Sequence, residues 1–177
     1  MKRLALLALL PLAALGSLAP LASPLPVSGD APTSLLTPLP GAVRTQGFGC
    51  TAFELEPAAP ACPGGHFHAG LDLAGPRPGT PVLAAAGGLV VAVVSSPTGY
   101  GRHVVLDHGH GLTTLYAHLL AAEVATGELV GRAQPIGQLG STGTSTGAHL
   151  HFEVRTGGRP ADPELYLPAA DFRGGAP

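Results

Sequence analysis

The chain has 177 residues, 26 of them Gly and 19 Pro, a charged fraction of only 11% and a formal net charge of −2. This length and this abundance of turn-forming residues indicate one small domain rich in turns. No basic run occurs beyond the first few residues, so the charge balance does not favour a nucleic acid or a strongly anionic polymer as partner.

The N-terminus has the layout of a secretory signal peptide. Lys2 and Arg3 precede an apolar run from Leu4 to Leu15, and small residues follow. Prolines interrupt this region, so a membrane span of about 20 apolar residues is not expected. We predict a signal peptide over residues 1–16, with an uncleaved anchor as the alternative. The protein is then secreted, periplasmic or wall-associated, without stable membrane insertion.

The next segment, residues 17–41, is rich in proline and shows no periodicity. This composition predicts a flexible or extended linker. We therefore expect a folded domain over residues 42–168 and a flexible tail over residues 169–177.

Short apolar segments separated by Gly-rich turns occur from Pro81 onward. They are Val82–Ala85, Leu89–Ser95, His103–Asp107, Leu112–Ala117 and His149–Arg155. Such segments are typical of β-strands, and no stretch shows a sustained helical period. The sequence predicts an all-β fold, either a barrel or a sandwich.

The last of these segments places two histidines side by side. Along a strand His149, His151 and Glu153 point to one face, while the alternating apolar residues point to the other face and into a core. Glu153 is a candidate partner for a histidine ring N–H, because ligand histidines usually donate to a carboxylate or a carbonyl. A salt link to Arg155 or simple solvation are the alternatives.

An earlier string, HFHAGLD, brings His68 and Asp72 within four residues of each other. In a straight strand their Cα atoms would lie about 13 Å apart, whereas zinc binds nitrogen and oxygen ligands at about 2.0 to 2.2 Å. The backbone must therefore bend, and Gly70 is where a bend costs least because glycine tolerates unusual backbone angles. One histidine and one carboxylate from here, with one histidine from the later strand, would leave a fourth position for water, as in catalytic zinc sites.

Zinc lowers the pKa of bound water to about 7, and imidazole with an ordinary pKa near 6.5 suits the accompanying proton transfer. His118, at the end of the strand-like LTTLY segment, and the second histidine of the pair are the candidates. The alternative for His118 is a strand-end histidine bonded to a backbone carbonyl. Because zinc ligands must be deprotonated, activity should fall below about pH 6.

Three long strings resemble a known family: FHAGLDLAGPRPGTPVLAAAGGLVVAV, GYGRHVVLDHGHGLTTLYAHL and GQLGSTGTSTGAHLHFEVRTGGRPADPELYL. From about Val43 to Leu167 the chain is similar to the lysostaphin-type, or LytM-like, zinc metallo-endopeptidases, which cleave peptide bonds in bacterial peptidoglycan. The resemblance implies a duplicated hybrid motif, with antiparallel sheets forming a barrel-sandwich and a groove that holds the metal site. It also implies peptidoglycan peptides as substrate, for a chain expected to be monomeric.

By this resemblance, His68, Asp72 and His151 bind one Zn²⁺ per chain. His118 and His149 are then the catalytic histidines, which orient water and stabilise the tetrahedral oxyanion. All five positions hold the expected residue type, whereas some relatives have lost ligands and only regulate other wall hydrolases. A non-catalytic regulator of a wall amidase is therefore the alternative function.

Two positions depart from the family pattern. Some members carry a tyrosine a few residues before the first ligand, but no tyrosine lies between Cys50 and His68. His110 stands where asparagine is expected, and we interpret it as a turn residue.

The two cysteines, Cys50 and Cys62, precede the metal string. In an exported chain a disulfide is the expected state, worth about 3 kcal/mol in the chain-entropy picture. It would hold this loop over the site. Thiolate ligation of zinc and two free thiols are the alternatives.

Other motif matches give weaker hypotheses. Residues 143–147 fit GxSxG, but that motif needs a following helix and a histidine after the acid, and no histidine follows Asp162. His66 and His68 resemble a cupin metal motif, which would leave the later histidines unexplained, so we expect His66 in an exposed loop. A sugar phosphotransferase domain with paired histidines conflicts with Asp72 and with the signal peptide.

Overall fold

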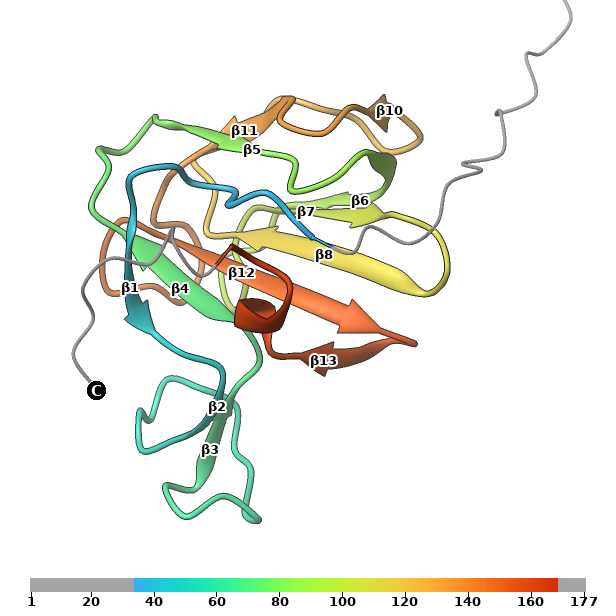
Figure 1. Cartoon of the computed structure of the whole chain (residues 1–177). Helices are drawn as coiled ribbons and strands as arrows, with labels where there is room; N and C mark the ends of the chain where they lie inside the picture. The colour runs from blue at the N-terminus through green and yellow to red at the C-terminus, as the bar shows by residue number, and fades with distance from the viewer. Residues whose placement is uncertain (1–33, 169–177) are drawn as a thin grey trace, which may run out of the picture.

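The computed structural model describes residues 34–168, and the predicted signal peptide and the predicted tail lie outside this range (Figure 1). Its regular structure is thirteen β-strands and one 3-10 turn, η1 (Pro163–Leu165). No helix in residues 34–168 is long and apolar enough to cross a membrane. The predicted all-β class with antiparallel sheets is confirmed.

One large antiparallel sheet forms the body of the domain. Its strands, in spatial order, are β1 (Val43–Gln46), β4 (Leu71–Ala74), β12 (His149–Thr156), β8 (Leu112–Ala117), β7 (His103–Asp107), β6 (Gly88–Val94) and β10 (Leu129–Val130). β13 (Arg159–Ala161) pairs with the far end of β12. The strands predicted at 103–107 and 112–117 are found with those bounds, and the other three differ by one or two residues at their ends.

Two smaller sheets complete the fold. The first has three strands, β5 (Pro81–Leu83), β11 (Pro135–Gln138) and β9 (Ala121–Ala122). In Figure 1, β5 and β11 are drawn above β8 and β12. A two-stranded sheet of β2 (Gly49–Thr51) and β3 (His66–His68) projects below the large sheet. Apart from β5, the strands of these two sheets lie outside the predicted set, because strands of two to four residues leave little periodicity to detect.

The core lies against the apolar face of β12. Leu150, Phe152 and Val154 are fully buried, as their alternation predicts. Tyr116 of β8 packs on Phe152 with ring centroids 5.3 Å apart. The opposite face of β12 is thereby fixed toward the candidate site.

The predicted linker boundary at residue 41 is wrong. Leu35 and Leu39 are fully buried in the core, and the Leu35 N–H donates to the Tyr166 carbonyl at 2.8 Å. The Leu83 N–H donates to the Pro38 carbonyl at 2.9 Å, so this segment is tied to β5. The sequence does not reveal these two core leucines, because they lie among prolines in a single extended segment that has no hydrophobic periodicity.

Candidate active site

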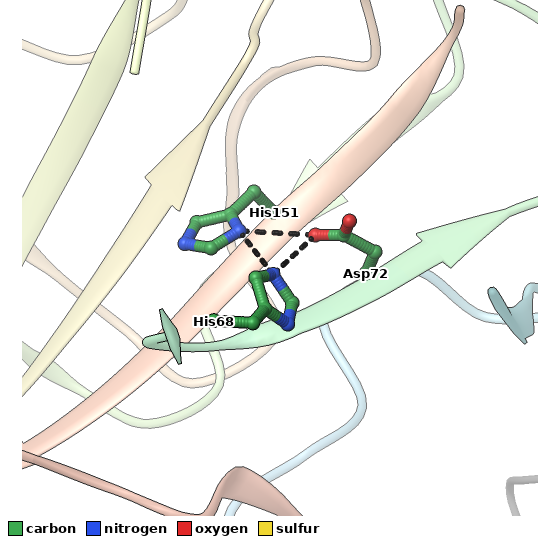
Figure 2. Close-up of side chains that lie close together, drawn as sticks. All are labelled: His68, Asp72 and His151. Carbon is green, nitrogen blue, oxygen red and sulfur yellow. Dashed lines mark hydrogen bonds and ion pairs between the residues drawn. The ribbon is translucent and has the colours of Figure 1, made fainter. Parts of the chain in front are cut away.

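Three side chains converge on one point between β3, β4 and β12 (Figure 2). His68 Nε2 lies 3.1 Å from Asp72 Oδ1 and 3.0 Å from His151 Nδ1. The third edge, from His151 Nδ1 to Asp72 Oδ1, is 3.0 Å. His68, Asp72 and His151, which the sequence predicts as ligands, are thus brought together, and all three are buried.

Strand register explains this convergence. β12 runs antiparallel to β4 with His151 directly opposite Asp72. Side chains of directly opposed residues lie on the same face, so the imidazole and the carboxylate are neighbours. His68 reaches the same point from the end of β3, after which the chain turns into β4.

Gly70 sits at this turn, as predicted, but for a different reason. Its φ is not in the left-handed region, so the backbone angle does not require glycine. A Cβ at Gly70 would instead lie 2.5 Å from the Phe152 carbonyl oxygen and 2.9 Å from His151 Nε2. Glycine is needed for the close approach of the turn to the β12 histidine.

The outer nitrogens of the two rings have fixed roles. His68 Nδ1–H donates to the Gly47 carbonyl at 2.7 Å, which leaves Nε2 without a proton in the neutral ring. His151 Nε2–H donates to the Glu153 carboxylate at 3.1 Å, which leaves Nδ1 bare. Glu153 therefore makes the contact predicted for it.

This donor set fits a zinc ion. Two bare imidazole nitrogens and a carboxylate oxygen are all acceptors, so they need a cation or a proton between them to stay about 3 Å apart. A tetrahedral zinc with bonds of about 2.1 Å has ligand atoms about 3.4 Å apart, close to the observed edges. The three residues offer one triangular face of such a site.

In the metal-free protein a proton takes the place of the cation. Burial lowers the pKa of His151, but hydrogen bonds with the Asp72 and Glu153 carboxylates outweigh burial and raise it to about 9. Burial raises the pKa of Asp72, whereas its hydrogen bonds with His151 and His68 hold it well below its usual range. Metal binding must therefore displace this proton.

His118 stands at the edge of the same site. β8 ends at Ala117, opposite His151, and His118 turns out of the sheet with a φ of 60°. That left-handed angle is strained for a residue other than glycine. Its Nδ1–H donates to the Thr142 carbonyl at 2.8 Å, so Nε2 is the free nitrogen. Burial lowers the pKa of His118 to about 4, which makes the ring neutral at pH 7.

His149, two residues before His151, forms the other side of this edge. Its ring centroid lies 4.7 Å from that of His118, and its Nε2 lies 3.7 Å from Asp72 Oδ2. Its Nδ1–H donates to the Gly147 carbonyl at 2.9 Å. Ser145 is followed directly by a loop and then by β12 rather than by a helix, so the GxSxG match lacks the required structural context. This string is instead the loop that holds the His149 ring.

A groove of about 550 Å³ runs past these residues. Its lining includes Phe53, Leu55 and Glu56 of the loop before β3, together with Tyr100 and the 144–148 loop. Phe53 and Leu55 are 42% and 52% exposed, so apolar surface is available to a ligand. An extended peptide has room to lie across the site.

A comparison with protein families identifies the domain. The profile of Peptidase family M23 matches residues 66–163, more than half of the chain. The chain belongs to peptidase family M23. The resemblance to lysostaphin-type peptidases is thereby confirmed.

Individual M23 relatives match parts of the chain. It is 48% identical over 107 residues to the DD-carboxypeptidase/endopeptidase Mpg of Neisseria meningitidis serogroup B, covering 60% of this chain and 24% of that protein. The chain thus spans about a quarter of that relative's length.

Two solved M23-type structures have the same fold. The catalytic domain of lysostaphin from Staphylococcus simulans has a TM-score of 0.56 at 32% identity, covering 70% of this chain and 90% of that one. A zinc-containing peptidase from Vibrio cholerae has a TM-score of 0.59 at 34% identity, covering 73% of this chain and 39% of that one.

The loop before β3 of this M23 domain is cross-linked. Cys50 and Cys62 form a disulfide, and no cysteine of the described residues is free. Glu56 of this loop accepts a hydrogen bond from Gln46 Nε2 at 3.2 Å, and its Oε1 lies 3.9 Å from His68 Nε2. Sequence analysis did not single out Glu56, because a lone loop carboxylate carries no spacing signal.

The structure also tests the predictions for two histidines outside the site, His66 and His110. His66 lies in β3 rather than in an exposed loop, and its Nδ1–H donates to the Glu56 carbonyl at 2.7 Å. That expectation is wrong because the string HFH pairs with β2, a partner too short to be recognised from sequence. His110 lies in the turn before β8 with a φ of 52°, which agrees with its interpretation as a turn residue.

Proposed function

We propose that this M23 domain is a zinc-dependent endopeptidase that hydrolyses peptide bonds in the stem or cross-bridge peptides of peptidoglycan. The observation that carries this proposal is the triangle of three acceptor atoms at His68, Asp72 and His151, with edges of 3.0–3.1 Å. Three protein ligands with a groove beside them are typical of catalytic rather than structural zinc sites. The relatives named as endopeptidases support the substrate class.

In this proposal His68 Nε2, Asp72 Oδ1 and His151 Nδ1 hold one zinc ion. Bound zinc supplies Lewis-acid activation of water and of the scissile carbonyl. Asp72 contributes one negative charge, while the two imidazoles are neutral ligands. Glu153 accepts the outer N–H of His151 and so keeps this ring in the tautomer that offers Nδ1.

His118 and His149 handle protons and developing charge beside the metal. Each ring donates Nδ1–H to a carbonyl, so each neutral ring turns Nε2 into the groove as an acceptor. His118, neutral at pH 7, suits the removal of a proton from the attacking water. A ring that has taken up that proton can then donate it to the leaving amine or to the oxyanion.

The groove is the proposed binding site for an extended peptide. Within its lining, Phe53 and Leu55 offer apolar contacts and the 144–148 loop offers small residues. The regulator alternative finds no support here, because a regulator needs no complete ligand set. The disulfide supports an extracytoplasmic location, which agrees with the predicted signal peptide.

The test is digestion of purified peptidoglycan by the zinc-loaded protein. Mass spectrometry of the products should reveal new peptide termini, and these identify the bond that is cut. His151→Ala, which removes one ligand, should release none of them. Intact wall of several cross-link types, despite one bound zinc per chain, would refute the proposal.

A further inference from the structure

A fully buried carboxylate connects the candidate metal site to the groove wall. Glu153 lies on β12 in the middle of the large sheet and has no solvent exposure. Its Oε1 accepts from His151 Nε2 at 3.1 Å and from the Tyr100 hydroxyl at 2.5 Å. Its Oε2 accepts from Arg155 Nε at 2.6 Å. A buried charge needs such partners, since an unpaired carboxylate would be costly.

Tyr100 supplies one of these donors from a distant part of the chain. It lies in the turn between β6 and β7, and its ring forms part of the groove. Arg155 Nη2 donates to the Tyr100 hydroxyl at 3.3 Å, so the hydroxyl both accepts and donates. The ring also lies near that of His151, with centroids 5.6 Å apart. The Tyr100 side chain therefore contacts both the candidate ligand His151 and its carboxylate partner Glu153.

The main chain of the same residue holds a second member of the site. The His118 N–H donates to the Tyr100 carbonyl at 3.0 Å. The turn is fixed to the loop whose carbonyl binds the His118 ring, because the Thr144 N–H donates to the Gly99 carbonyl at 2.9 Å. One short turn thus anchors both a candidate ligand and a candidate proton acceptor.

We propose that Tyr100 is a positioning residue of the metal centre, acting through Glu153 on His151. With one oxygen bound by Tyr100 and the other by Arg155, the Glu153 carboxylate has a fixed plane before the imidazole contacts it. His151 then donates Nε2–H in one direction only and presents Nδ1 to the metal. Partners outside the ligand set typically change metal affinity by about 10- to 100-fold when they are removed.

This inference rests on the proposed zinc function, but its central measurement needs no catalysis. Tyr100→Phe removes the hydroxyl and keeps the ring in the groove wall. We expect its zinc dissociation constant, measured by competition with a chromophoric chelator, to rise about 10-fold. Glu153→Gln, which keeps the shape and removes the charge, should weaken zinc binding at least as much.

Tyr166→Phe is the matched control, since Tyr166 lies at the end of η1 and outside the groove lining. It should bind zinc as the wild type does. The unfolding midpoint of each metal-free variant shows that a changed affinity does not reflect a lost fold. If Tyr100→Phe does not fold, Arg155→Gln, which removes the donor to the other oxygen, should weaken zinc binding in the same direction.

The outcomes separate this inference from the function on which it rests. A Tyr100→Phe dissociation constant within twofold of wild type would overturn the positioning role, and a rise in KM alone would make Tyr100 a substrate contact. Weaker zinc binding in Tyr100→Phe, with no cleavage of peptidoglycan by the wild type, would keep the positioning role and refute the peptidase. A wild type that binds no zinc would refute both the positioning role and the zinc peptidase.

Discussion

The affinity for zinc should depend on pH through one residue. In the metal-free protein, burial lowers the pKa of His151, but hydrogen bonds with Asp72 and Glu153 raise it to about 9. Zinc needs the same nitrogen without its proton. Below pH 9 the metal must therefore displace a proton that two carboxylates hold in place.

The pKa sets the size of the effect. At pH 7, two units below the pKa, zinc should bind about 100-fold more weakly than above pH 9, with a change of about tenfold per pH unit. The stability of the metal-free protein should change in the opposite direction. Since the folded-state pKa lies above the ordinary value of 6.5, this stabilisation is complete below pH 6.5 and is lost as pH rises through 9. The loss should be about 3 kcal/mol.

The assay is calorimetric titration of zinc from a chelator buffer into metal-free protein between pH 6.5 and 9.5. Two buffers with different ionisation enthalpies give the number of protons released, which should be about one at pH 7 and approach zero above pH 9. Glu153→Gln removes one carboxylate, so its plateau should begin at a lower pH, and the affinity on that plateau should be weaker than that of the wild type above pH 9. A wild-type dissociation constant that is flat between pH 7 and 9 would show that His151 holds no such proton.

Three further variants test other parts of the site and the fold. His118→Ala should lower kcat by about 100-fold or more at saturating zinc while zinc affinity stays within twofold, and an equal loss of zinc would make His118 a ligand instead. Because burial lowers the pKa of His118 to about 4, the wild-type kcat at saturating zinc should persist to about pH 5. Gly70→Ala should weaken zinc binding more than tenfold in equilibrium dialysis, because its Cβ would lie 2.9 Å from His151 Nε2. Gly131→Ala, in open space, is the control and should leave binding unchanged. Leu35→Ala should lower the free energy of unfolding, measured in urea, by about 3 kcal/mol. A change near zero would show that Leu35 does not contribute to the core and that its segment is a linker.

The part of the site that lies on one strand could be predicted from sequence. The alternation in HLHFEV fixes which residues face the core, because side chains along a strand alternate between two faces. The burial of Leu150 and Phe152 agrees with that pattern. The convergence of His68 and Asp72 with His151 followed from the chemistry of ligand types and from family resemblance. The register that pairs Asp72 with His151 is a long-range fact, and no local pattern reveals it.

The features that the sequence does not reveal depend on contacts between residues far apart in the chain. Tyr100 and Glu153 are 53 positions apart, and only the packing of the β6–β7 turn against β12 brings them together. The sequence predicts a linker at Leu35, because burial of one extended segment leaves no hydrophobic period. The sequence predicts the turn at Gly70 correctly. Glycine is required there, however, because His151 occupies the space that a Cβ would need, and this tertiary constraint is not visible in the sequence.

Two glycines show how such tertiary constraints set the chemistry. A Cβ at Gly143 would lie 2.3 Å from the Gly101 nitrogen, and a Cβ at Gly101 would lie 2.4 Å from the Thr142 carbonyl carbon. Both also have φ in the left-handed region, at 76° and 61°, so each position favours glycine twice over. This contact brings the two loops close enough for the Thr142 carbonyl to accept His118 Nδ1–H at 2.8 Å. The free nitrogen that His118 turns to the groove is therefore determined by backbone contact between two loops, outside the metal ligands themselves.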